Sequence, residues 1–371
     1  MKNKNIEELK ELVEHGNTDA MNELAYRYGT GNGCERNDEK SIELLKRAVQ
    51  LGSKKAQYNL AVSYYYGRGI TKDVKTAFEM FKELSEKYEH KKSNYFLGEI
   101  YYLGKAIEKD YEKAFKYITN ALEYDSDDKD AKYYLAKMLY SGQGTEKNIK
   151  KAIELFEELY QKFEDRDALM MLADAYYYSP EQNYEKAYKY CSKILEEADK
   201  YIKSKDDEYW TKRTLGQLYY FGQYVEQDFK KALDYYMDIV EMDNSGMISY
   251  HIGWMNYEGQ GTPKNLENSF VYFKQSAENG FSFGQFMLAQ AYLCGEGTAC
   301  DDNKAVYWFE QASLNGYSKA QYKLGMIYYY GEDNGLSIKK DTKYAIQLFK
   351  KAAEGGSKEA VAELDKLGQI S

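Results

Sequence analysis

A short motif returns at nearly constant intervals along almost the whole chain, and this repetition constrains the fold more than any other feature. The motif pairs leucine or isoleucine with alanine or glycine, as in LAVSYYYGRG at 60–69, LADAYYYS at 172–179 and LGMIYYYG at 324–331. Its copies begin at Leu24, Leu60, Leu97, Leu135, Leu172, Leu215, Ile252, Leu288 and Leu324. Successive copies lie 36 to 38 residues apart, except for a step of 43 residues before Leu215. A period of this length indicates one small structural unit stacked many times.

Each copy carries the signals of two helices joined by a turn. Seven residues after the motif leucine stands a glycine, replaced in the fifth copy by Ser179. Glycine can end a helix in the left-handed conformation that other residues resist. An Asp or Asn then follows in every copy, and its side chain can accept hydrogen bonds from the free N–H groups of a new helix. These predicted N-caps are Asn37, Asp73, Asp110, Asn148, Asn183, Asp228, Asn265, Asp301 and Asp341.

Segments such as AQYNLAVSYYYGRG…DVKTAFEMF and AKYYLAKMLYSGQG…NIKKAIELF resemble the Sel-one-like repeat family, a branch of the tetratricopeptide superfamily. The resemblance covers about residues 19–357. It implies an all-α, right-handed α-solenoid of about nine helix–turn–helix repeats, whose first helices line the concave side. It also implies an adaptor or scaffold that binds other proteins. Helical spacing of apolar residues in 1–18 and in 358–371 predicts a capping helix at each end.

Three departures interrupt the repetition. The fifth copy places Ser179 and Pro180 in its turn, the join to the sixth copy is longer, and the ninth turn carries the insertion GEDNGLSIKKD. The first two departures are adjacent, so the solenoid is expected either to bend or divide near 179–210 or to tolerate neutral variation in its loops.

Helical geometry separates the consecutive tyrosines of the motif. With the motif leucine at 0° and about 100° added per residue, the tyrosine at +4 lies at about 40°, on the buried side. The tyrosine at +5 lies at about 140°, on the opposite face, and the residue at +6 at about 240°, which we expect to face a neighbouring repeat. Residues at −2 and +2 share the face of the +5 column.

That face is aromatic in most copies, although an isolated amphipathic helix should be polar there. If the first helices line a groove, these rings form a tyrosine ladder that can bind a partner, because tyrosine offers a large area, few rotors and a polar tip. With 41 tyrosines in the chain, packing between repeats is the alternative interpretation. The predicted partner-binding residues are Tyr58, Tyr65, Tyr95, Tyr102, Tyr133, Tyr140, Tyr177, Tyr220, Tyr250, Trp254, Tyr257, Phe286, Tyr322 and Tyr329.

Composition argues against several classes of function. A net charge of −9 opposes a general role on nucleic acid and docking on an anionic membrane. No apolar run approaches the roughly 20 residues that span a bilayer, and the first residues lack the apolar core of a signal peptide. Four cysteines without regular pairing then indicate reduced thiols and a cytoplasmic location. Self-association through exposed aromatic residues is a further possibility.

We find no catalytic, cofactor-binding or metal-binding pattern. The Gly-x-Gly turns lack the strand and the GxxxxGK[ST] form of a phosphate loop. His15, His90 and His251 lie in different copies, and Cys294 and Cys300 flank one turn. The sequence therefore predicts a non-catalytic protein-binding scaffold. The alternatives are a hydrolase of cell-wall or β-lactam substrates, or a cytoplasmic immunity or regulatory protein that binds and neutralises a partner.

Overall fold

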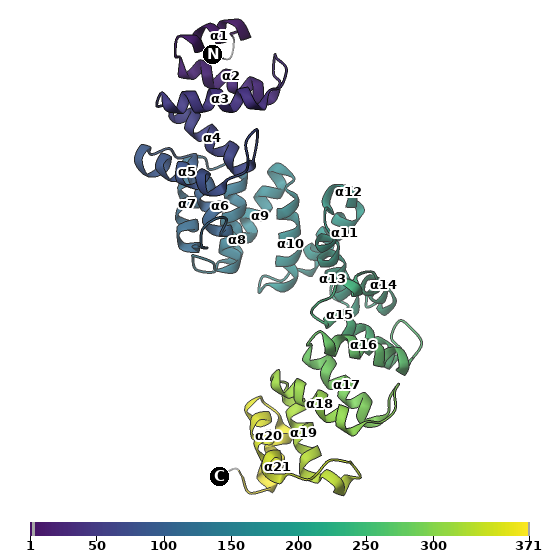
Figure 1. Cartoon of the computed structure of the whole chain (residues 1–371). Coiled ribbons are helices and arrows are strands. Elements are labelled where there is room, and N and C mark those ends of the chain that lie inside the picture. Colours follow the sequence, from purple (N-terminus) through teal and green to yellow (C-terminus); the bar gives the residue numbers. More distant parts are fainter. Residues whose placement is uncertain (2–3, 370–371) are drawn as a thin grey trace. The chain divides into compact units, whose positions relative to one another are not determined.

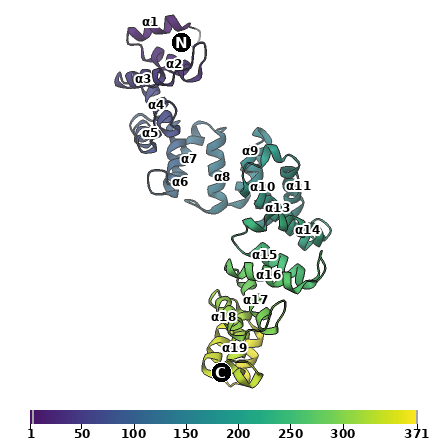
Figure 2. The ribbon, with the colours of Figure 1, turned by 45° about the vertical axis from the view of Figure 1, so that its right-hand side comes forward.

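The computed structural model describes residues 1 and 4–369, and every regular element within them is a helix. The predicted all-α solenoid of paired helices is thereby confirmed (Figures 1 and 2). Residues 2–3 and 370–371, which belong to the two predicted capping segments, lie outside the described residues.

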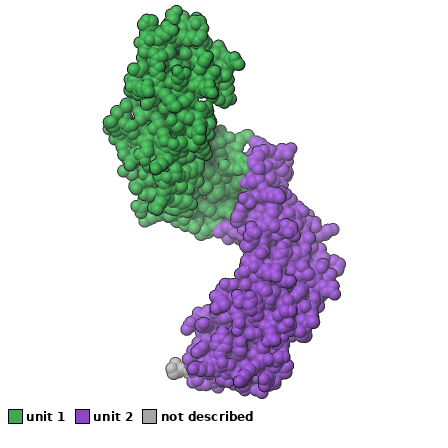
Figure 3. Space-filling view, in the orientation of Figure 1, with its two compact units in different colours: residues 1–175, 179–181 green, residues 176–178, 182–371 purple. Residues whose placement is uncertain are grey.

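The chain divides into two compact units, residues 1–175 with 179–181, and residues 176–178 with 182–371 (Figure 3). The helices that begin in unit 1 are α1 Ile6–Glu14, α2 Thr18–Thr30, α3 Asp38–Gln50, α4 Lys54–Tyr66, α5 Val74–Tyr88, α6 Ser93–Leu103, α7 Tyr111–Tyr124, α8 Lys129–Ser141, α9 Ile149–Phe163 and α10 Arg166–Tyr178. The helices of unit 2 are α11 Tyr184–Glu196, α12 Ala198–Tyr201, α13 Lys205–Phe221, α14 Phe229–Ile239, α15 Met247–Glu258, α16 Leu266–Glu278, α17 Ser282–Cys294, α18 Asp302–Leu314, α19 Ser318–Tyr330, α20 Thr342–Glu354 and α21 Lys358–Lys366. Unit 2 also contains two short 3-10 helices, η1 Val240–Met242 and η2 Gly331–Asn334. The last turn of α10 belongs to unit 2, so the boundary falls at the shortened fifth turn.

The first helices of the repeats are α2, α4, α6, α8, α10, α13, α15, α17 and α19, and the next long helix in each repeat is its second helix. Helix α1 packs on α2 and buries Leu9, and α21 packs on α20 and buries Leu364. The short helix α12 occupies the long join before the sixth repeat. The small residue after the motif leucine lies against the second helix: a Cβ added to Gly216 would lie 2.5 Å from the Tyr236 ring. Larger residues there would push the two helices apart.

All nine predicted N-cap residues are N-caps, and each side chain accepts a hydrogen bond from a backbone N–H in the first turn of its helix. Each N-cap residue also donates its own backbone N–H to the carbonyl of the residue at +4, as Asp73 does to Tyr64 at 2.9 Å. The fifth repeat keeps this bond, from Asn183 to Tyr176 at 2.8 Å, although Ser179 has an extended backbone. The shortened turn therefore preserves the hairpin.

The Gly-x-Gly turn serves packing between repeats. Gly67 ends α4 in the left-handed conformation, with φ at 74°. The second glycine of a turn contacts the preceding repeat: a Cβ added to Gly144 would lie 2.0 Å from the backbone oxygen of Tyr111, at the start of α7. A side chain at Gly144 would therefore separate neighbouring repeats.

Candidate functional site

The predicted tyrosine ladder divides into buried and half-buried rings. Tyr65 is 3% exposed and Tyr177 is also buried, so the prediction that these two rings line an open groove is wrong. The other predicted residues are half-buried, namely Tyr58, Tyr95, Tyr102, Tyr133, Tyr140, Tyr220, Tyr250, Trp254, Tyr257, Phe286, Tyr322 and Tyr329.

Packing between repeats explains the two buried rings. The Tyr65 ring lies edge-on against Phe96 of the next first helix, with ring centroids 5.3 Å apart. Lys105 Nζ donates a hydrogen bond to the Tyr65 hydroxyl at 2.8 Å. Burial, and then the charge of Glu99, raises the pKa of this hydroxyl well above its ordinary value. The helical-wheel argument treats one hairpin alone, whereas in a stack the face opposite the core meets the next repeat.

Carboxylates of neighbouring repeats accept hydrogen bonds from other tyrosine hydroxyls in unit 1. Tyr140 donates to Asp174 Oδ2 at 2.7 Å, and Tyr134 donates to Glu99 Oε1 at 3.3 Å. Lys105 Nζ lies 3.3 Å from the same Glu99 oxygen. Asp174 and Glu99 both stand two residues after a motif leucine, so this position receives hydroxyls from the preceding or following repeat.

Several exposed rings of the first helices stand one residue later than predicted. At +6, Tyr66 is 46% exposed, Tyr178 is 37% exposed and Phe221 is 51% exposed. We expected these side chains to face a neighbouring repeat, and they do: Tyr66 lies against Phe96, Tyr178 against Arg213, and Phe221 against His251. Each ring is nevertheless exposed on its other side. At −5, close to +6 on the helix, Trp210 and Phe283 are also exposed. We call the face formed by positions −5 and +6 of the first helices the solvent-facing stripe.

Four side chains on one side of α13 define a cluster with Tyr178 of α10, and two of them, Trp210 and Phe221, belong to the stripe. Trp210, Arg213, Gln217 and Phe221 are spaced by three, four and four residues, which places them on one side of the helix. Arg213 Cζ lies 4.9 Å from the Trp210 ring centroid and 5.1 Å from that of Tyr178. The Tyr178 hydroxyl donates to Gln217 Oε1. We call these five residues the α13 patch, and all of them belong to unit 2.

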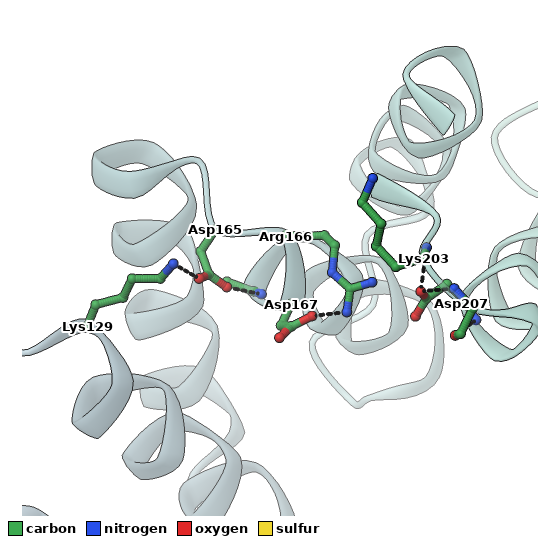
Figure 4. A network of polar contacts seen from close by, with 8 residues as sticks. Lys129, Asp165, Arg166, Asp167, Lys203 and Asp207 are labelled. Atoms are coloured by element: carbon green, nitrogen blue, oxygen red, sulfur yellow. Dashed lines mark hydrogen bonds and ion pairs between the residues drawn. The ribbon is translucent and has the colours of Figure 1, made fainter. Parts of the chain in front are cut away.

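A capping box sets the start of α13. The Asp207 carboxylate accepts the backbone N–H of Ser204 at 3.0 Å and that of Lys203 at 2.9 Å, while the Ser204 hydroxyl accepts the Asp207 N–H (Figure 4). These bonds satisfy donors that would otherwise be free at the helix end. They stabilise the first turn of α13, and Trp210 stands in the turn that follows.

The start of α10, also drawn in Figure 4, shows how unit 1 pairs its cations. Asp165 accepts the Ala168 N–H at 2.7 Å and lies 2.7 Å from Lys129 Nζ. Arg166 is paired with Asp167. Basic side chains here have carboxylate partners within the chain.

The first repeat lacks the ladder tyrosine, because Gly29 stands at +5. A cavity of about 220 Å³ lies there, and its lining includes Tyr26, Gly29, Arg36, Asn59 and Arg68. Arg36 is paired with Asp38 at 2.8 Å.

The described residues contain no group of three or more His, Cys, Asp or Glu side chains that could hold a metal ion. Cys294 and Cys300 are exposed and unbonded, and His251 lies among the rings of Tyr220 and Tyr236. Within the same part of the chain, no helix has both the length and the apolar character needed to cross a membrane.

Stacked helical hairpins that present aromatic side chains on their first helices define an α-solenoid repeat protein. The family model described as "Sel1 repeat" matches residues 18–53, 54–87, 91–123, 129–162, 166–199, 215–236, 249–281, 282–317 and 318–357. The chain therefore belongs to the Sel1 repeat family, whose members generally mediate protein–protein interactions.

Two solved structures and one curated protein are among those similar to this chain. A Sel1 repeat protein from Oxalobacter formigenes is 20% identical, with a TM-score of 0.55 over 98% of this chain and 90% of that one. A protective antigen present in uropathogenic Escherichia coli strains, described as displaying an SLR fold, is 24% identical, with a TM-score of 0.42 over 98% of this chain and 67% of that one. The ERAD-associated E3 ubiquitin-protein ligase component HRD3A of Arabidopsis thaliana is 31% identical over 65 residues, which are 18% of this chain and 9% of the plant protein.

Sequence reasoning missed Arg213 and the +6 rings. Arg213 stands at −2, where most repeats carry an aromatic residue, so its departure from the column was the available signal. Finding the exposed +6 rings from the sequence would have required treating each first helix as packed against two neighbours, its own second helix and the next repeat.

Proposed function

We propose that this protein is a non-catalytic adaptor that binds a segment of a partner protein along the solvent-facing stripe of unit 2. The observation that carries the proposal is the α13 patch, where Trp210, Phe221 and Tyr178 are exposed around an arginine. Residues that dominate binding energy at protein interfaces are enriched in Trp, Tyr and Arg. Exposed aromatic side chains gathered in this way are typical of interaction sites.

Half-buried rings of the tyrosine ladder add contact area next to this patch. Trp254 stacks on Tyr257 with ring centroids 5.7 Å apart, and Tyr250 lies 5.8 Å from the exposed ring of Phe283. Rings held by such contacts lose little conformational entropy when a partner covers them. In this proposal the ladder rings contribute rigid contact area, while the exposed side chains at −5 and +6 insert between side chains of the partner.

The proposal also includes a cytoplasmic location, as the cysteine pattern predicts. The short match to a plant protein named as a component of a ubiquitin ligase supports a role within a larger assembly.

A capture experiment from the native host tests this proposal. The double variant Trp210→Ala with Phe221→Ala is compared with Val271→Ala and Tyr307→Ala together, which remove equally exposed side chains from second helices. We expect the first pair to reduce recovery of a specific partner at least tenfold and the control pair to leave it unchanged. Equal recovery with both pairs would reject the stripe of unit 2 as the binding surface.

A further inference from the structure

We infer that Arg213 binds an acidic side chain of the partner, a Glu or Asp with apolar neighbours, at the centre of the α13 patch. This inference rests on the proposed function and names the chemistry of the segment that the patch recognises.

The Arg213 guanidinium has no carboxylate within ion-pair distance among the described residues. Its hydrogen-bond acceptor there is the Met247 sulfur, 3.9 Å from Nη2, and a thioether is a weak acceptor. Its Nε is buried and has no hydrogen-bond partner in the described part of the chain. A partly desolvated cation without a strong acceptor is costly, and a ligand carboxylate would remove much of that cost.

The flanking rings favour a planar anion. Trp210 and Tyr178 lie within 5.1 Å of Arg213 Cζ, where ring faces stabilise a guanidinium and restrict its rotation. A fixed guanidinium can donate two parallel N–H groups to one carboxylate. A lysine at position 213 would supply the charge without the planar pair of N–H donors. We therefore expect arginine and lysine at this position to bind a carboxylate with different affinity.

The charge of the rest of the chain makes this arginine stand out. Acidic residues outnumber basic ones, 60 to 51, and Arg36 pairs with Asp38 and Arg166 with Asp167. Arg47 and Arg68 form no ion pair among the described residues, but both are exposed to water, whereas Arg213 is partly buried. In the patch, aromatic and amide side chains occupy the positions around Arg213. The positive charge of Arg213 is therefore available to bind an anionic group of a partner.

The spacing along α13 predicts the partner's pattern. Trp210 precedes Arg213 by about 4.5 Å along the helix axis, and Phe221 follows it by about 12 Å, at 1.5 Å per residue. An extended segment advances about 3.3 Å per residue with alternate side chains on one face. An apolar residue two positions from the acidic residue and another four positions away on the other side would reach both rings.

Fluorescence anisotropy with a labelled peptide tests the inference. The probe Ser-Leu-Gly-Glu-Ser-Gly-Ser-Phe-Ser has the predicted spacing, and two matched probes carry Gln or phosphoserine in place of Glu. The full chain is compared with Arg213→Gln, with Arg213→Lys, and with Arg36→Gln, which changes the net charge equally within unit 1. Melting curves identify any variant that fails to fold. If Arg213→Gln fails to fold, Arg213→Lys, which keeps the positive charge, still tests the inference.

We expect the wild-type chain to bind the Glu probe at least tenfold more tightly than the Gln probe. Arg213→Gln should abolish this preference, Arg213→Lys should reduce it at least threefold, and Arg36→Gln should preserve it. Equal affinity for the Glu and Gln probes, a preference that survives Arg213→Gln, or no binding at about 1 mM would overturn the inference. Tenfold tighter binding of the phosphoserine probe would assign the site to phosphate instead. A host partner that depends on Phe221 but not on Arg213 would keep the adaptor proposal and reject this inference alone.

Discussion

The α4–α6 region of unit 1 and the part of unit 2 formed by residues 176–178 and α13 each contain a run of three tyrosines at the end of a first helix. The two regions differ in how the charged side chains beside these tyrosines are paired. In both regions the middle tyrosine, Tyr65 or Tyr177, is buried and the third, Tyr66 or Tyr178, is exposed. Position +2 of the following repeat is Glu99 in unit 1 and Gln217 in unit 2. Lys105 contacts both Glu99 and Tyr65, so unit 1 contains a cation and an anion that satisfy each other.

In the described part of unit 2, the cation beside the corresponding rings has no such anion. Arg213 stacks against Tyr178 and Trp210, and the nearby polar side chain of Gln217 is neutral. The tyrosine run therefore fixes packing between repeats in both regions. Binding capacity depends on the few side chains around it that are left without internal partners.

The largest expected effect separates the middle tyrosine from its neighbour. Tyr65→Ala should lower the free energy of unfolding of unit 1 by about 3–5 kcal/mol, because it leaves a cavity between repeats. Tyr66→Ala should cost about 1 kcal/mol or less, since nearly half of that side chain is exposed. Hydrogen exchange followed by mass spectrometry measures the loss locally, which suits repeat arrays that need not unfold in one step. Equal losses would mean that the two faces are assigned wrongly.

A second effect concerns pH and the buried histidine of unit 2. Burial lowers the pKa of His251 to about 4, against about 6.5 in an unfolded chain. The unfolded chain therefore binds a proton between these values that the folded chain does not, and stability falls as pH drops from 6.5 to 4. The loss should approach about 3 kcal/mol.

Urea unfolding of wild-type and His251→Phe chains across this pH range measures the effect. The variant should lose that part of the slope. His90 of unit 1 hydrogen-bonds Ser93 and is the matched control, and His90→Phe should flatten the slope less. Parallel pH profiles for wild type and His251→Phe would show that His251 is not held neutral.

A third effect isolates a hydroxyl from its ring. Tyr140→Phe keeps the packing of the ring and removes the hydrogen bond to Asp174, so unit 1 should lose about 1–1.5 kcal/mol. Tyr140→Phe with Asp174→Asn should show coupling in a double-mutant cycle by urea unfolding. Additive effects would mean that the tyrosine tip contributes nothing between repeats.

The smallest expected effect on stability belongs to the α13 patch. Trp210→Ala and Phe221→Ala should each change the free energy of unfolding of unit 2 by about 0.5 kcal/mol or less, as for most surface substitutions. Both should still impair partner capture. A loss of several kcal/mol in urea unfolding would show that these rings are structural.

Local interactions are the part of this fold that its sequence predicts well. Asp73 caps α5 through atoms three residues apart, and Gly67 ends α4 through its own backbone preference, so both features follow from short segments. The repetition of such segments is sufficient to predict the paired helices and their order.

The faces of the first helices depend on contacts between repeats, which no single repeat encodes. Tyr65 and Tyr66 are the same residue type and both contact Phe96 of the next repeat, with ring centroids 5.3 and 6.2 Å away, yet only Tyr65 is covered. Arg213 became visible as a candidate only when its neighbours showed that no carboxylate of the described residues reaches it. The sequence could place it in an aromatic column but could not reveal its missing partner.

Hydroxyl-radical footprinting with and without a captured partner tests the central claim most directly. In the free protein we expect strong labelling of Tyr66, Tyr178 and Phe221 and weak labelling of Tyr65 and Tyr177. On binding, Tyr178, Trp210 and Phe221 should become protected while Tyr307 keeps its labelling. Strong labelling of Tyr65 and Tyr177 in the free protein, or protection of Tyr307 without protection of the α13 patch, would contradict the account.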